Sequence, residues 1–180
     1  MTTEEIIITI VRVAGALLVL RWALAGGLVA IAVDLSDLFL MNLLDQGGVR
    51  DYQSLYKWLD LAYMATFLVV ALRWSGLTRQ VAVLLFGYRI IGVVVFEIVG
   101  ERWKLLGFPN VFEFWFLFVA AAQHFRPGYQ FTTRRSMAWL VVLLAAKEVQ
   151  EYALHGARWL DQYVAVDLVA DWWRWLARWF

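Results

Sequence analysis

Long apolar runs alternate with short polar breaks along most of this chain. A helix that crosses a membrane needs about 17–25 mostly apolar residues, and six segments approach that requirement. We expect helices over residues 6–20, 23–44, 52–74, 80–99, 109–125 and 135–154. The pattern therefore predicts an all-α fold, a polytopic transmembrane bundle of about six spanning helices within residues 1–155.

Turn-forming residues set the boundaries of these helices. Residues 45–51 hold two glycines and alternating charges, which favour a loop, and residues 75–76 end the third helix. Pro109 suits the first turn of the fifth helix, where a missing N–H costs little. Residues 21–22 separate the first two segments, but a single helix running through residues 26–27 is the alternative.

The end of the chain, residues 156–180, combines charged and aromatic residues. Its charged residues and its tryptophans each recur at intervals of three or four, as on a helix: Asp167, Asp171, Arg174 and Arg178, and Trp172, Trp175 and Trp179. The segment is too polar to span a membrane, and Trp is favoured in the headgroup region. We expect a second unit here, an amphipathic helix that lies in the membrane interface, with a disordered tail as the alternative.

The composition agrees with a membrane location. The chain is 63% hydrophobic and 17% charged, whereas soluble domains are about half apolar and a quarter charged. Without Cys it has no thiolate chemistry and no Cys-ligated zinc, and two His exclude haem held by several His pairs. A net charge of +1 argues against a nucleic-acid partner, and no nucleotide-binding motif is present.

The topology leaves the orientation open. The acidic first residues do not resemble a signal peptide, so we expect the first apolar run to be retained as a helix. With six spans, one side holds seven Lys and Arg residues and the other holds six: Arg21, Arg73, Arg79, Arg126, Arg134 and Arg135. That difference indicates no orientation under the positive-inside rule. The lack of Cys and of organelle targeting signals favours a multi-pass protein of the bacterial plasma membrane.

Charged residues interrupt several apolar segments. They are Asp34, Asp37, Asp60, Arg89, Glu97, Lys147, Glu148 and Glu151. A charge in the middle of a bilayer costs about 2.5–3.5 kcal/mol on insertion scales, so it persists only where it faces the bundle interior, a wet cavity or a partner. These residues predict an intramembrane site.

Three of the carboxylates are expected to converge. Asp34 and Asp37 share one face of the second helix, and Tyr56 and Asp60 share one face of the third. A short loop joins the two helices, which favours antiparallel packing with these faces opposed. Converging carboxylates repel one another unless a cation joins them or one is protonated, and oxygen ligands suit Mg²⁺, Mn²⁺ or Ca²⁺.

A cluster that only holds the helices in register is the alternative interpretation of the same residues. In that arrangement Asp60 pairs with Arg12 or Lys57, and tyrosine hydroxyls satisfy the remaining polar atoms.

The spacing of the acidic residues resembles that of the CDP-alcohol phosphatidyltransferases, which have six transmembrane helices. Their pattern D-x2-D-G-x2-A-R-x8–9-G-x3-D-x3-D is matched at its first, second and last acidic positions by Asp34, Asp37 and Asp60. The segment from Thr9 to Arg12 is also similar to a T-x-x-R element of that family. The resemblance implies Asp34 and Asp37 as ligands of Mg²⁺ or Mn²⁺, Asp60 as the catalytic base toward an acceptor alcohol, and a transferase of phospholipid metabolism.

The chain departs from the family pattern at the remaining positions. Leu38 replaces a glycine, Met41 and Asn42 replace the Ala-Arg pair, Tyr52 replaces the second glycine, and Tyr56 replaces the third acidic metal ligand. The missing arginine is the cation that would hold a pyrophosphate. The departures predict a degenerate member whose activity is altered or lost.

The sixth segment carries a second row of ionisable residues. Lys147, Glu151 and His155 follow one face, with Glu148 beside them. The row suits an intrahelical ion pair, a headgroup site or a proton relay. A small transporter or proton-coupled carrier is therefore the main rival function, and a membrane scaffold that is not an enzyme is the third.

The charges near the ends of the fourth and fifth segments are less informative. Glu97 lies two turns beyond Arg89, and Glu101 and Glu113 lie close to basic residues 102 and 104. We expect a solvated or snorkelling set at the helix ends. The partners implied by the whole pattern are membrane lipids, together with a second copy of the chain or another membrane protein.

Overall fold

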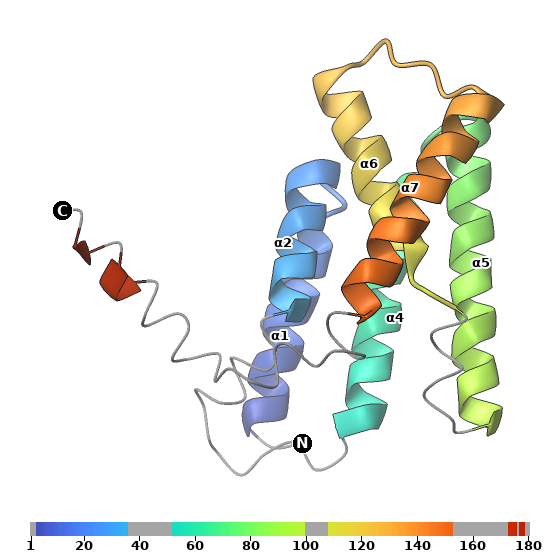
Figure 1. Ribbon diagram of the computed structural model, residues 1–180. Helices are drawn as coiled ribbons and strands as arrows, with labels where there is room; N and C mark the ends of the chain where they lie inside the picture. The colour runs from blue at the N-terminus through green and yellow to red at the C-terminus, as the bar shows by residue number, and fades with distance from the viewer. Residues whose placement is uncertain (1–2, 36–51, 100–107, 153–172, 176, 179–180) are drawn as a thin grey trace.

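The computed structural model describes residues 3–35, 52–99, 108–152, 173–175 and 177–178, and all regular secondary structure within them is helical (Figure 1). The helices are α1 (Thr3–Leu18), α2 (Ala23–Leu35), α4 (Tyr52–Ala71), α5 (Gly76–Val99), α6 (Val111–Phe125) and α7 (Thr133–Glu151). The predicted all-α fold is confirmed, and these helices lie within the six apolar segments or extend them by a few residues.

A turn separates the first two helices, so the alternative of one continuous helix is wrong. The backbone N–H groups of Leu20 and Arg21 donate to carbonyls three residues earlier, at 3.1 Å each, which closes the turn after α1. Gly26 allows α2 to lie close against the end of α1, because a Cβ at that position would lie 2.5 Å from the Leu18 carbonyl carbon. The second helix is described as far as Leu35, and the predicted residues 36–44 lie outside the described part of the chain.

The start of α6 also differs from the prediction. The helix begins at Val111 with Asn110 as its N-cap residue, so Pro109 precedes the helix instead of lying in its first turn. The Pro109 carbonyl accepts a hydrogen bond of 2.8 Å from the Val111 N–H, which turns the chain into the helix.

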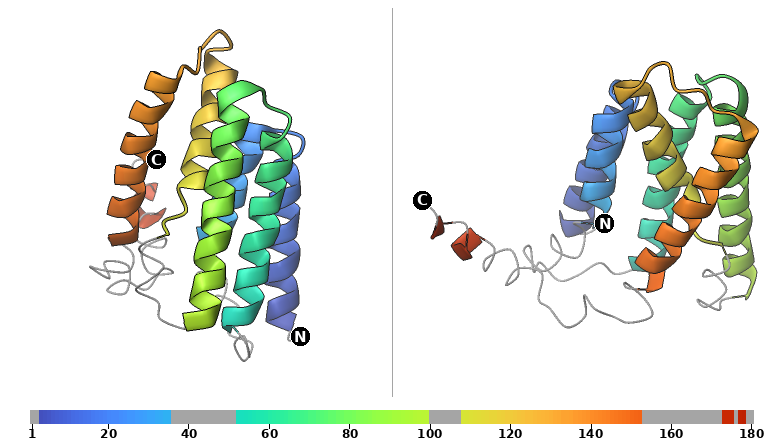
Figure 2. Two further views of the ribbon diagram at one scale, coloured as in Figure 1. Left: turned by 90° about the vertical axis from the view of Figure 1, so that its right-hand side faces the viewer. Right: turned by 45° about the horizontal axis from the view of Figure 1, so that its top comes forward.

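The described helices form three antiparallel hairpins, α1–α2, α4–α5 and α6–α7, whose connections lie at the same end of the bundle (Figure 1). Helix α4 lies between α1 and α5 (Figure 2), and α6 contacts α2, α4, α5 and α7. Helices α4 and α6 therefore form the centre, and α7 packs mainly on α6.

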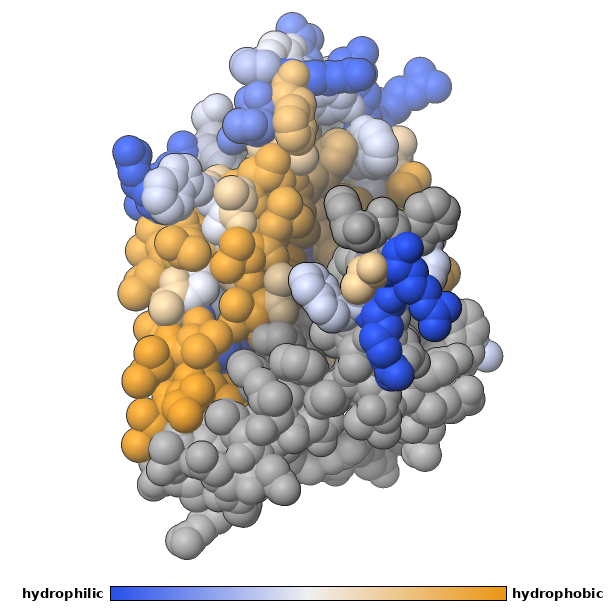
Figure 3. All heavy atoms as spheres, turned by 90° about the vertical axis from the view of Figure 1, so that its left-hand side faces the viewer, coloured by the Kyte–Doolittle hydropathy of each residue, from blue (hydrophilic) through white to orange (hydrophobic). Residues whose placement is uncertain are grey.

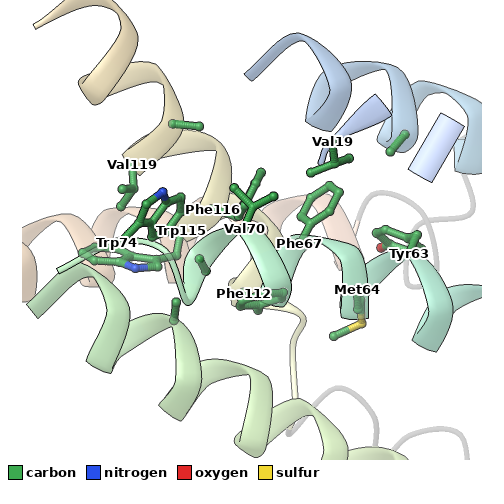
Figure 4. Packing of buried hydrophobic residues seen from close by; sticks show 14 of the residues in the cluster. Val19, Tyr63, Met64, Phe67, Val70, Trp74, Phe112, Trp115, Phe116 and Val119 are labelled. Carbon is green, nitrogen blue, oxygen red and sulfur yellow. The ribbon is translucent and has the colours of Figure 1, made fainter. Parts of the chain in front are cut away.

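Aromatic side chains from α4 and α6 fill the core between these central helices (Figure 4). The ring of Phe116 lies 4.3 Å from that of Phe67 and stacks on Trp74 at 5.2 Å, measured between centroids. The Trp115 indole N–H donates to the Thr78 carbonyl at 3.2 Å, which satisfies a buried donor and joins α6 to α5.

One helix among the described residues is long and apolar enough to cross a membrane, the segment Gly76–Ile98 of α5. Three further apolar helices are shorter, at Ala23–Asp34, Leu59–Ala71 and Val111–Phe125. Apolar side chains also cover much of the lateral face in Figure 3, below hydrophilic residues gathered at its upper end.

The predicted interfacial helix over residues 156–180 lies mostly outside the described residues. The described part of that segment comprises Trp173, Arg174, Trp175, Ala177 and Arg178, all of them exposed.

Candidate functional site

Arg12 brings together two of the predicted site carboxylates. Its Nη2 atom donates to Oδ1 of Asp60 at 2.6 Å, and the same nitrogen contacts Oδ1 of Asp34. The Tyr63 ring lies 5.9 Å from the guanidinium carbon and lines the same space. The three helices α1, α2 and α4 therefore meet at one guanidinium group, as in the register-holding interpretation.

The accessibility of these charges is uneven. The Arg12 side chain is 3% exposed, whereas those of Asp34 and Asp60 are 31% and 44% exposed. A buried guanidinium with partly exposed carboxylates leaves the acidic side of the cluster accessible from outside the helices. Hydroxyl or ammonium donors of a ligand suit that acidic side, because carboxylates accept strong charge-assisted hydrogen bonds.

Three helices thus contribute to one cluster, which we call the ionic cluster: Arg12, Asp34 and Asp60. A further arginine, Arg89, lies on α5, and its Nη1 atom donates to the Phe108 carbonyl at 3.0 Å.

The divalent-metal hypothesis for Asp34 and Asp37 stays a prediction. Among the described residues, no group of three or more Asp, Glu or His side chains is placed to hold a metal ion. The guanidinium of Arg12 already supplies the positive charge between Asp34 and Asp60 that a metal ion was expected to supply. The third expected acidic residue, Asp37, lies outside the described residues.

A second buried polar group joins α6 to α7, and we call it the α6–α7 cluster: Asn110, Glu113, Lys147 and Gln150. Lys147 Nζ lies 4.0 Å from Glu113 Oε2, and both side chains are less than a tenth exposed. Glu113 Oε1 accepts a hydrogen bond of 2.5 Å from Asn110 Nδ2, and Lys147 donates to Gln150 at 3.0 Å. Two opposite charges therefore lie together in an apolar core, and each has a hydrogen-bonding neighbour.

The prediction that Glu113 belongs to a solvated set at the helix ends is therefore wrong. Glu113 lies in the first turn of α6, a central helix, between the buried residues Phe112 and Trp115. Its position as the one acidic residue in an otherwise apolar helix is the signal that could have identified it. Lys147, predicted to lie in a polar row on its own helix, reaches across to Glu113.

Both clusters occupy a similar level of the bundle. At 1.5 Å per residue, Asp34 and Asp60 lie about 17 Å along their helices from the connected end, and Lys147 about 21 Å. That level is close to the middle of the longest helix, α5, which is about 36 Å long.

The remaining predicted residues are Tyr56, Glu97, Glu148, Glu151 and His155. Glu97 and Glu148 are exposed. Tyr56 and Glu151 lie on α4 and α7, but their side chains are outside the described part of the molecule, as is the whole of His155.

No family model, no curated protein and no solved structure matches this chain.

Proposed function

We propose that this chain is a multi-pass integral membrane protein of the bacterial plasma membrane, with its six described helices embedded in the bilayer. The distribution of side chains supports this. Helix α1 exposes Ile6, Ile10 and Leu17 along one stripe while it buries Arg12, and α5 exposes Leu84, Ile91 and Ile98 at intervals of seven residues. A water-soluble helix has the reverse pattern, and large exposed apolar surfaces are typical of membrane contact.

Within this bundle the ionic cluster is proposed to bind the polar headgroup of a lipid. The observation that carries the proposal is that Arg12 holds Asp34 and Asp60 together while both carboxylates stay partly exposed. Ionisable residues at membrane depth are costly and mark functional sites. A headgroup supplies hydroxyl or ammonium donors to these carboxylates.

Distant kinship with the CDP-alcohol phosphatidyltransferases is part of this proposal. The acidic positions Asp34 and Asp60 meet across neighbouring helices, and Arg12 of the T-x-x-R-like element joins them. The resemblance assigns Asp60 the role of a base toward an alcohol of the bound lipid. The substitutions at Leu38, Asn42 and Tyr56 favour headgroup binding with altered or lost transfer activity.

The test is the thermal stability of the detergent-purified chain in the presence of short-chain phospholipids with different headgroups. A ligand that binds only the native state raises the unfolding temperature, so at least one headgroup is expected to stabilise the wild type. Asp60→Asn and Asp34→Asn should remove that gain, while Glu148→Gln, a change at an exposed carboxylate, should keep it.

Two outcomes would contradict the headgroup site. If the unfolding temperature is the same with every headgroup, the carboxylates do not bind a lipid headgroup. A rise with Mg²⁺ or Mn²⁺ alone, lost in Asp34→Asn, would assign the site to a metal ion instead.

A proton-coupled carrier is the second candidate, and the α6–α7 cluster favours it. The buried pair of Glu113 and Lys147 gives the bundle two titratable groups at membrane depth, as in proton relays. In liposomes, proton or solute flux should then disappear with Glu113→Gln and persist with Glu148→Gln. Absence of flux for a panel of solutes would remove this candidate.

A further inference from the structure

The three helical hairpins are free of carboxylates over most of their length. Residues 6–33, 61–96 and 114–147 contain no Asp or Glu, so all fifteen carboxylates of the chain lie elsewhere. The same three ranges contain the six arginines Arg21, Arg73, Arg79, Arg126, Arg134 and Arg135 in or next to their connections. The sequence alone leaves these arginines as three separate groups.

The fold gathers the three groups at one end of the bundle, because the connections of all three hairpins lie there (Figure 1). All six arginines are exposed, and hydrophilic residues gather at this end in Figure 3. Arg73 Nη1 donates to the Leu20 carbonyl at 3.1 Å, so the first two connections are in direct contact. We call this surface the arginine end.

Aromatic side chains surround the arginine end. Trp22, Phe125 and Trp139 are exposed there, and the guanidinium of Arg135 lies 5.7 Å from the centre of the Tyr129 ring. Exposed Trp and Tyr next to basic residues are typical of the headgroup level of a membrane. The arginine end therefore combines the two residue classes that contact lipid headgroups.

We propose that the arginine end binds the phosphate groups of anionic phospholipids and so faces the leaflet that is richer in them. Arginine holds phosphate through paired, charge-assisted N–H donors. No carboxylate in the three hairpin ranges competes for these arginines, and basic residues at a membrane surface are attracted by anionic lipid. This inference rests on the proposed membrane location but not on the headgroup site at Asp60.

The test compares phosphatidylglycerol and phosphatidylcholine in mixed micelles with the full-length chain, and counts retained lipids by native mass spectrometry. The wild type should retain phosphatidylglycerol several-fold better than phosphatidylcholine, and added salt should reduce the difference because exposed charges are screened. The triple variant Arg79→Gln, Arg126→Gln and Arg134→Gln should lose most of the preference, since it removes three of the six charges.

Two matched variants control for folding and for charge in general. Replacing the same three arginines with Lys should restore much of the preference. Arg174→Gln with Arg178→Gln removes two exposed charges outside the arginine end, and should leave the preference unchanged.

The inference is overturned if the wild type retains both lipids equally, or if the Gln triple variant keeps the wild-type preference while its helical circular dichroism is unchanged. The inference is also overturned if the chain shows no lipid preference and instead binds an acidic protein partner through these arginines. Membrane fractionation separates the two proposals: a chain that leaves the membrane fraction in carbonate contradicts the proposed function itself. A chain that stays there without lipid preference contradicts only the role of the arginine end.

Discussion

Arg12 Nη2 lies 2.6 Å from Asp60 Oδ1, although 48 positions separate the two residues in the chain. The same nitrogen contacts Asp34, so one guanidinium ties α1 to both α2 and α4. Rotating α1 by one residue would move Arg12 by about 100°, since an α-helix has 3.6 residues per turn, and would separate these charges. The cluster therefore fixes the rotation of α1 as well as its position.

Replacing Arg12 with Met should lower the free energy of unfolding by about 1–3 kcal/mol, because it removes a charge-assisted hydrogen bond and leaves two partly exposed carboxylates facing each other without their cation. Asp60→Asn should cost less, since Arg12 keeps Asp34 and Asp60 is partly exposed. Reversible denaturation in mixed micelles measures both values. Arg126→Met, at an exposed arginine, is the control, and an Arg12→Met variant as stable as this control would refute the structural role of the cluster.

The Glu113–Lys147 pair should show strong coupling in a double-mutant cycle. Glu113→Gln or Lys147→Met alone leaves one buried charge without its counterpart and should cost about 3–5 kcal/mol. The double variant should cost clearly less than the sum of the two, because no unbalanced charge remains. Additive losses in the same denaturation experiment would mean that the two charges do not interact.

Two glycines on α5 provide a matched test of helix packing. A Cβ at Gly92 would lie 2.4 Å from the Cβ of Phe108, whereas nothing lies within 4 Å of a Cβ at Gly87. Gly92→Ala should therefore destabilise the chain by about 1–3 kcal/mol through overpacking. Gly87→Ala should stabilise it by up to about 1 kcal/mol through helix propensity. Equal unfolding temperatures for the two variants would contradict the close approach of Phe108.

The aromatic core predicts a large effect at Phe116. This ring is fully buried between Phe67 and Trp74, so Phe116→Ala leaves a cavity and should cost about 3–5 kcal/mol. Phe125→Ala on the same helix removes a ring that is 73% exposed and should change stability by less than about 1 kcal/mol. The difference in unfolding temperature between the two variants measures the contribution of the core. Similar temperatures would argue against the packing in Figure 4.

The positions of the helices could be predicted because they depend on local information. An apolar run bounded by glycine, proline or charge forms a helix wherever it lies in the fold, and the described helices follow such runs. The proximity of Asp34 and Asp60 could be predicted for a similar reason. Their helices are neighbours in the chain, and helical spacing defines the face on which each residue lies.

The partners of the buried charges could not be predicted in this way. The pairing of Glu113 with Lys147 depends on how α6 and α7 pack, and the sequence between them does not specify that packing. The break between α1 and α2 was ambiguous because its turn residues are weak signals, and the close contact of Gly26 with Leu18 became visible only in three dimensions.

The sequence by itself determined which segments are helical and apolar, because helix formation and hydrophobicity are properties of neighbouring residues. Only the tertiary structure decided that Arg12 is the cation between Asp34 and Asp60, that Glu113 is buried, and that six separate arginines share one end. Each of these features joins residues far apart in the chain, where the packing of whole helices and the attraction of opposite charges select the contacts.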